Sequence, residues 1–134
     1  MPDSIELEVA TPDRLLVRED VSEMQVPGKD GYLGILPGHA PLLGQLGTGF
    51  LSYKAGTRLR YLSVCGGFLE VLPDHVRVLA DVAERAEEID VERARKAMQR
   101  ALDQVMNPSI GIDPAAALGA LLRAQTRVET AEKK

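Results

Sequence analysis

The sequence predicts two modules, an N-terminal β-sandwich over residues 1–84 and a C-terminal antiparallel hairpin of two helices over residues 85–134. Three observations support this prediction. Apolar and polar residues alternate in many short runs before residue 84, which is typical of strands with one buried face. Most of the glycines lie in the same region, largely between those runs. After residue 84 the chain is rich in Ala, Arg and Glu.

The first module begins with a clear strand pattern, because Ile5, Leu7 and Val9 alternate with Glu6 and Glu8. Further strands are expected at 15–18, 24–26, 32–36, 49–55, 58–64, 68–72 and 76–80. Turn-forming residues at 27–31, 55–56, 66–67 and 73–74 separate these runs. Many short, closely spaced strands favour a sandwich or barrel, and we expect a small β-sandwich.

The second module begins with a helix that Asp90 is expected to cap. Its small and apolar residues, from Val91 to Val105, follow a period of 3.6. The Asn107-Pro108 pair should end this helix, because proline removes a backbone donor and restricts the residue before it.

A second helix is expected after Asp113-Pro114, which supplies an N-cap followed by proline at the first helical position. Its apolar face is predicted to consist of Leu118, Leu121, Leu122 and Val128. Each helix is only a few turns long, and neither should be stable alone in water. The apolar faces must therefore dock on each other, on the sandwich or on a partner.

Composition and charge disfavour several classes of protein. The 134 residues include 16 basic and 20 acidic side chains, for a net charge of −4, and only 4% are aromatic, so nucleic-acid binding is not expected. The single Cys65 cannot form an internal disulfide. No apolar run is long enough to span a membrane, and the N-terminus lacks a secretion signal. We expect a soluble intracellular protein.

The sequence offers little catalytic chemistry. Its two histidines, His39 and His75, cannot form a metal cluster of usual spacing, so no metal site is expected. The only Gly-Lys pair, Gly28-Lys29, is followed by Asp30 instead of the Ser or Thr of a phosphate loop. Cys65 has no accompanying base pattern and is expected to be a small core residue at a strand end.

Two segments allow more than one interpretation. The Pro-, Gly- and Leu-rich segment 32–43 is either a buried corner of the sandwich or a preformed contact surface. The basic residues Arg93, Lys96 and Arg100 share one face of the first helix, and Arg123 and Arg127 share one face of the second. These faces are either solvated or, if the hairpin brings them together, an anion site in which Arg would suit phosphate.

Four segments occur in this order: Thr11-Pro12-Asp13, the run GYLGILPGHAPLL at 31–43, the run GGFLEV at 66–71 and the run AERAEEID at 83–90. Together they resemble the epsilon subunits of F-type ATP synthases. The resemblance covers nearly the whole chain and implies a non-catalytic central-stalk subunit that couples proton translocation to ATP synthesis. It implies that the sandwich binds the gamma subunit and the c-ring. The contact residues would be Tyr32, Leu36, Pro37, Gly38, His39, Ala40, Pro41 and Leu42.

The resemblance also implies a regulatory hairpin that inhibits ATP hydrolysis when it extends toward the alpha and beta subunits. Some bacterial members bind ATP on the folded hairpin through an Ile/Leu-Asp-x-x-Arg-Ala motif, which residues 89–94 match in full. By this similarity the ATP-binding residues would be Glu84, Ile89, Asp90, Arg93, Ala94, Arg100, Arg123 and Arg127. No resident cofactor is implied, ATP would be a regulatory ligand, and the involvement of Mg²⁺ is left open.

The family often has an acidic residue where this chain has Tyr32, so a charged ring contact is not expected there. The implied location is the cytoplasmic face of a bacterial plasma membrane, reached through the complex, or alternatively the stromal side of a thylakoid. Two rival functions remain, a stand-alone ATP-binding sensor and a small enzyme that uses Cys65 or His39. Co-purification with the gamma subunit distinguishes the stalk subunit from both rivals.

Overall fold

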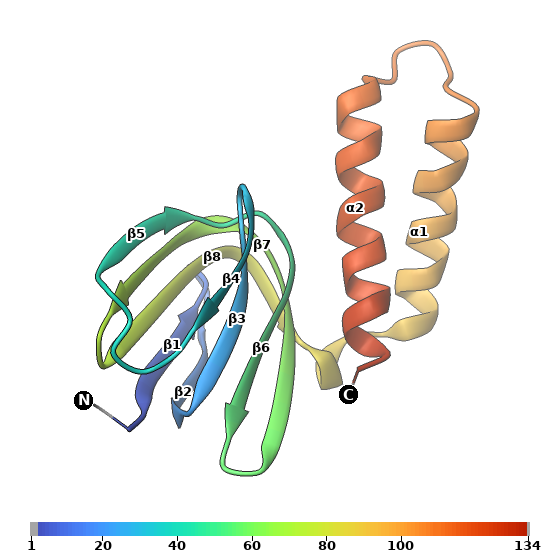
Figure 1. Cartoon of the computed structure of the whole chain (residues 1–134). Coiled ribbons are helices and arrows are strands. Elements are labelled where there is room, and N and C mark those ends of the chain that lie inside the picture. The colour runs from blue at the N-terminus through green and yellow to red at the C-terminus, as the bar shows by residue number, and fades with distance from the viewer. Residues whose placement is uncertain (1–2, 134) are drawn as a thin grey trace.

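The alternating segments of the sequence form eight strands in the computed structural model, which describes residues 3–133. The strands are β1 (Ile5–Ala10), β2 (Leu15–Val21), β3 (Glu23–Gly28), β4 (Gly31–Ile35), β5 (Leu42–Gln45), β6 (Thr48–Ala55), β7 (Arg58–Leu72) and β8 (His75–Arg85). They follow the order β2-β1-β8-β7-β6-β3-β4, with β5 paired to β7. The sheet curls so that its strands surround a common interior (Figure 1).

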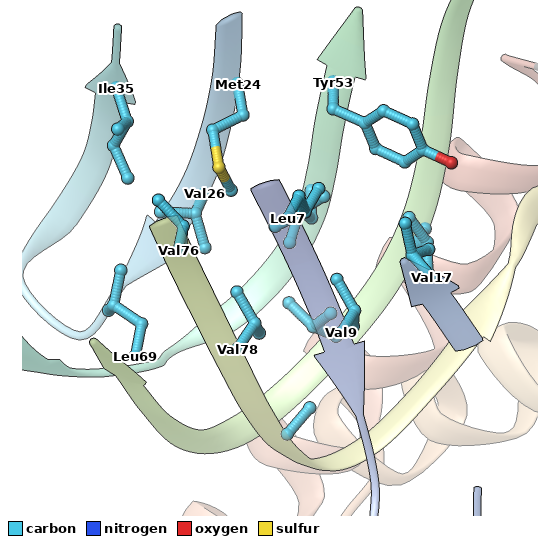
Figure 2. Packing of buried hydrophobic residues seen from close by; sticks show 14 of the residues in the cluster. Leu7, Val9, Val17, Met24, Val26, Ile35, Tyr53, Leu69, Val76 and Val78 are labelled. Carbon is cyan, nitrogen blue, oxygen red and sulfur yellow. The ribbon is translucent and has the colours of Figure 1, made fainter. Parts of the chain in front are cut away.

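The interior is filled by the apolar residues that alternate along these strands. Leu7, Val9, Val76 and Val78 are fully buried, and they meet side chains from β3, β4 and β7 across the sheet (Figure 2). Burying each such side chain stabilises the fold by about 1.5–3 kcal/mol. The predicted sandwich is confirmed, and this core lies entirely within the strand-forming part of the chain.

The predicted turn at Gly66-Gly67 is wrong, because β7 runs unbroken through both glycines. The N-terminal half of β7 pairs with β6, and its C-terminal half pairs with β5. The glycines lie where the partner changes, and they adopt φ values of +70° and +112°. Their left-handed backbone lets β7 bend between its two partners without breaking its register with β8. Cys65 therefore lies inside a strand and not at its end.

Other strands also differ from the prediction, and β2 extends to Val21 instead of residue 18. Strand β8 continues to Arg85 and does not end at residue 80. The short strand β5 was not expected, because Leu42–Gln45 follows a proline and shows little alternation.

Both helices begin where the sequence predicts, and α1 also ends where it predicts. After a short 3₁₀ turn, η1 (Ala86–Glu88), the helix α1 spans Val91–Met106, and α2 spans Pro114–Ala131. The Asp90 carboxylate accepts a hydrogen bond from the backbone N–H of Arg93 at 3.2 Å. The Asp113 carboxylate accepts one from the N–H of Ala115 at 3.1 Å. The helices run antiparallel, and α2 lies between α1 and the sandwich (Figure 1).

Helix α2 docks on β6, β7 and η1. Its predicted apolar face is partly wrong, because Leu118 and Leu122 are 55% and 48% exposed. Small and β-branched residues are buried instead where α2 contacts α1 and the sandwich. The buried residues of α2 are Ala117, Ala124, Thr126, Val128, Thr130 and Ala131. Within the described residues, neither helix is long and apolar enough to cross a membrane.

We predict that Gly67→Ala destabilises the protein by at least about 2 kcal/mol. A Cβ at this position would lie 2.1 Å from the carbonyl oxygen of Leu79, and the φ of +112° disfavours any side chain. The matched control is Gly34→Ala, where no heavy atom lies within 4 Å of the added Cβ. It should change the free energy of unfolding by less than about 0.5 kcal/mol. Urea unfolding measures both, and equal stabilities for the two variants would contradict the account of β7.

Candidate functional site

The base of the hairpin is a small apolar cluster that joins the two helices. Ile89, Ala94, Val128 and Ala131 form its buried centre, and Ile89 is only 3% exposed. Asp90 lies between the 3₁₀ turn and α1, where its carboxylate caps the helix. The Ile89, Asp90 and Ala94 side chains of the predicted ATP motif therefore have structural roles in this conformation.

The four arginines of the predicted ATP site share one side of the hairpin. Each directly precedes a buried residue, in the pairs Arg93-Ala94, Arg100-Ala101, Arg123-Ala124 and Arg127-Val128, and Ala94 and Val128 belong to the cluster that joins the helices. One residue corresponds to a rotation of 100° around a helix axis. The helices α1 and α2 are antiparallel and face each other (Figure 1), and in such a pair the same rotation from the interface places side chains on the same side. The basic faces predicted from the sequence thus lie on one side of the hairpin.

Arg127 is the member of this group that reaches the sandwich. Its Nε donates to Glu84 Oε1 at 2.7 Å, and its Nη2 donates to Glu84 Oε2 at 3.2 Å. Glu84 is near the end of β8 and Arg127 is in α2, so this two-bond ion pair links the two modules. The side chains are 29% and 26% exposed, and partial burial makes such a charged, forked contact stronger than an ordinary surface pair.

Beside this ion pair, a cavity of about 60 Å³ separates α2 from the sheet. Cys65 and Ser63 line it from the sheet, and Arg123, Thr126 and Arg127 line it from α2. Pockets that hold drug-sized ligands usually measure about 300–1,000 Å³. The cavity is therefore too small for a nucleotide while α2 is docked.

The remaining predicted phosphate ligands are available to an anion. Among residues 3–133, Arg93, Arg100 and Arg123 form no ion pair. By contrast, Arg95 on another face of α1 is paired with Glu92 at 3.4 Å and Glu132 at 3.5 Å. Unpaired cations held on one side of a hairpin repel one another, and a multivalent anion would relieve that repulsion.

A second pair of contacts fixes the start of the hairpin to the sandwich. Arg14, in the β1–β2 turn, binds both carboxylate oxygens of Glu88 at 2.7 Å and 3.0 Å. The hydrogen bonds from Arg14 hold the pKa of Glu88 below its ordinary value. The guanidinium of Arg85 donates to the carbonyl of Leu16 at 3.1 Å and 2.6 Å. Sequence analysis missed these contacts because the partners are about seventy residues apart and no spacing rule connects them.

The predicted partner-binding loop, between β4 and β5, is exposed and braced. Leu36 is 60% exposed, and Ala40 and Pro41 are also exposed. The N–H of Gly38 donates to the carbonyl of Pro73 at 2.7 Å, and the Nδ1 of His39 lies 2.7 Å from the carbonyl of Ala40. The loop is therefore not a buried corner. It presents apolar side chains on a backbone that is held in place.

The two ends of this loop are part of the sandwich. Leu42 begins β5 and is partly buried against the core. The ring of Tyr32 lies on the ring of Phe50, with centroids 5.2 Å apart, and its hydroxyl accepts a hydrogen bond from the Phe50 N–H at 3.2 Å.

The residues of the rival enzyme hypothesis are not arranged for catalysis. The Cys65 sulfur accepts a hydrogen bond from the Thr48 hydroxyl at 3.2 Å. A hydroxyl group is not a base that could activate the thiol. His39 and Cys65 belong to separate parts of the sandwich, the β4–β5 loop and the middle of β7. In the described part of the chain, no group of three or more potential ligands could hold a metal ion.

Comparisons with known proteins decide the family. The model of the "ATP synthase, Delta/Epsilon chain, beta-sandwich domain" matches residues 4–86. The "ATP synthase epsilon chain" of Solibacter usitatus is 64% identical over the full length of both chains. The chain belongs to the ATP synthase epsilon-chain family. The relative from Koribacter versatilis is 54% identical over 101 residues, which are 75% of this chain and 71% of that one.

Solved structures agree with this family. A chain in the Euglena gracilis mitochondrial ATP synthase, described as "OSCP/F1/c-ring", has a TM-score of 0.82 and 26% identity, and the match covers 94% of this chain and 80% of that one. A chain of the Tetrahymena thermophila central stalk and c-ring, at 17% identity and a TM-score of 0.59, shares the fold. The resemblance seen in the sequence is confirmed. As an epsilon-family member the chain is a non-catalytic stalk subunit of ATP synthase, and the enzyme hypothesis is wrong.

Proposed function

We propose that the sandwich joins the gamma subunit to the c-ring and turns with them. The support is the exposed, braced β4–β5 loop together with the family assignment. The related chain from Euglena gracilis belongs to an assembly that contains F1 and a c-ring. The residues proposed for the contact are Tyr32, Leu36, Pro37, Gly38, His39, Ala40, Pro41 and Leu42. Leu36, Pro37 and Pro41 would supply apolar contact area at little entropic cost, because the loop is already held in shape.

The hairpin is proposed to exchange between the docked state and an extended one. The observation that supports this is the composition of the docking face, where Thr126 and Thr130 are buried and larger apolar residues of α2 remain exposed. Small side chains bury little apolar area, so docking contributes a modest free energy. A modest free energy is what a switch between two states requires.

In the extended state, the basic residues of both helices would meet acidic segments of the alpha and beta subunits. That contact would block rotation and inhibit ATP hydrolysis. The same basic residues are close together only when the hairpin is closed, so a ligand that binds them would favour the closed state. A ligand shifts such an equilibrium by its difference in affinity for the two states.

ATP is the proposed ligand, bound on the basic side of the hairpin. Arg93, Arg100 and Arg123 would bind the phosphates, since guanidinium groups form paired hydrogen bonds with phosphate oxygens. Arg127 would contribute only in part, because Glu84 already holds it. This competition predicts a weaker site than four free arginines would make.

The proposed location is the cytoplasmic face of the bacterial plasma membrane. Bacterial relatives of high identity support this proposal. The chain would be held there through its partners in the complex.

The first prediction about function concerns removal of the hairpin. A chain ending at Glu88 keeps every strand and the Arg14–Glu88 contact, so it should still assemble into ATP synthase. The complex should hydrolyse ATP faster than the complex with the full chain, measured on purified enzyme of equal subunit content. An unchanged hydrolysis rate with normal assembly would contradict the inhibitory role.

The second prediction concerns ATP binding by the isolated chain. Calorimetric titration should show that Arg123→Ala weakens ATP binding roughly ten- to a hundredfold, the loss expected for hydrogen bonds to a charged group. The matched control is Arg95→Ala, which removes an equal charge from a different face of α1. It should change the affinity less than about threefold. Equal losses in the two variants, or no binding at millimolar ATP, would contradict the proposed site.

A further inference from the structure

Lys133, just beyond the end of α2, contacts two aromatic rings of the sandwich. Its Nζ lies 4.8 Å from the ring centre of Phe50 and 5.4 Å from that of Tyr61. Both distances are within the range in which a cation is attracted to the face of an aromatic ring. Phe50 is in β6 and Tyr61 is in β7, so the contact joins the C-terminal end of the hairpin to the centre of the sheet.

The position of Lys133 is fixed by its backbone. The N–H of Lys133 donates to the carbonyl of Thr130 at 3.1 Å, and the N–H of Glu132 donates to that of Val128 at 3.1 Å. Glu132 is also paired with Arg95 of α1 at 3.5 Å. These bonds continue the last turn of α2, so the ammonium group is held over the rings by the helix end.

The aromatic surface beneath Lys133 is also ordered. The rings of Phe50 and Tyr61 are 6.1 Å apart and meet edge to face, and Tyr32 packs on Phe50 from the other side. Aromatic pairs with this geometry attract each other. The three residues come from three different strands, so the surface is part of the sheet and does not depend on the hairpin for its shape.

We propose that Lys133 and the Glu84–Arg127 ion pair form a two-point latch that holds the hairpin on the sandwich. The two contacts are the charged attachments of α2 to the sheet within residues 3–133. The residues buried near them, Thr126 and Thr130, are small. With so little apolar area in the interface, each charged contact has a large share in deciding whether the hairpin is docked.

This latch deepens the proposed regulation, because it rests on a hairpin that can leave the sandwich. Opening would break both contacts together and uncover Phe50, Tyr61 and the cavity wall at Cys65. The latch does not depend on nucleotide. It gives the docked state its own stability before any ligand binds.

The single cysteine of the chain supplies a direct test. Cys65 is partly buried and lines the cavity that α2 covers, so its thiol should react with a disulfide reagent faster when the hairpin opens. The rate of thiol modification is measured on the full chain without ATP. Lys133→Met keeps the aliphatic stem and removes the charge, and the modification should become about two- to fivefold faster, which corresponds to one cation–π contact at an exposed site.

Two matched variants test whether loss of the cation over the rings causes the faster thiol modification. Lys133→Arg keeps a cation over the rings and should stay within about twofold of the original rate. Lys96→Met removes an equal charge from an exposed position of α1 that forms no ion pair in the described chain, and it should also leave the rate unchanged. A Lys133→Met rate equal to that of Lys96→Met would overturn the proposal. A thiol that reacts in the original chain as fast as in urea-unfolded protein would also overturn it, since the hairpin would then not be docked.

Proton NMR gives an independent measurement. The ε-methylene protons of Lys133, held over two rings, should resonate upfield of those of Lys96. A resonance at the ordinary lysine position would contradict the latch. Neither measurement uses ATP or the assembled enzyme, so failure of the latch is distinguishable from failure of ATP binding or of inhibition.

Discussion

The ion pair between Glu84 and Arg127 is the charged contact that joins α2 to β8, and docking of the hairpin on the sandwich depends on it together with Lys133. Helices in proteins owe most of their stability to tertiary packing, so α1 and α2 need each other and the sandwich. The apolar cluster around Ile89 and Val128 joins the helices at their base. The sandwich, however, offers α2 a surface lined by Ser63, Cys65 and other small residues. A forked, partly buried ion pair at the edge of that surface determines how α2 sits on it.

The same arrangement would let the proposed ATP binding and the proposed switching share one set of residues. Arg127 serves the docked state through Glu84, while Arg93, Arg100 and Arg123 remain unpaired on the same side of the hairpin. Docking therefore uses one of these four arginines and leaves the other three for an anion. An extended hairpin would separate Arg127 from Glu84 and turn all of these cations toward a new partner. The charge of Arg127 is paired within the chain in the docked state and would be paired with another subunit in the extended state. Such an exchange of partners is a simple basis for two states of similar free energy.

Much of this structure is predictable from local patterns. The alternation at Ile5–Ala10, the caps at Asp90 and Asp113, and the helix end at Asn107 follow from neighbouring residues alone, and all are found where expected. The predictions that failed have a common cause, which is that tertiary contacts override the local pattern. Gly66 and Gly67 have the chemistry of a turn, and only the change of partner from β6 to β5 shows that they bend a continuous strand. Leu118 and Leu122 have the spacing of a buried face. However, α2 packs closely on α1 and on the sandwich, and this favours Ala and Thr at its buried positions. In the candidate site, residue types were readable from sequence, whereas the Glu84–Arg127 and Lys133 contacts depend on tertiary structure.

The most direct test of this account is a reversible lock on the docked hairpin in the complete ATP synthase. Thr126→Cys places a second thiol on the wall of the cavity that Cys65 also lines, and a short thiol-cleavable crosslinker can join the two. We predict that the crosslinked complex hydrolyses ATP faster than the same complex after cleavage, because the hairpin cannot extend. The unsubstituted chain, treated in the same way, should show no change. A crosslinked complex as inhibited as the cleaved one would contradict the claim that release of α2 from the sandwich is what inhibits the enzyme.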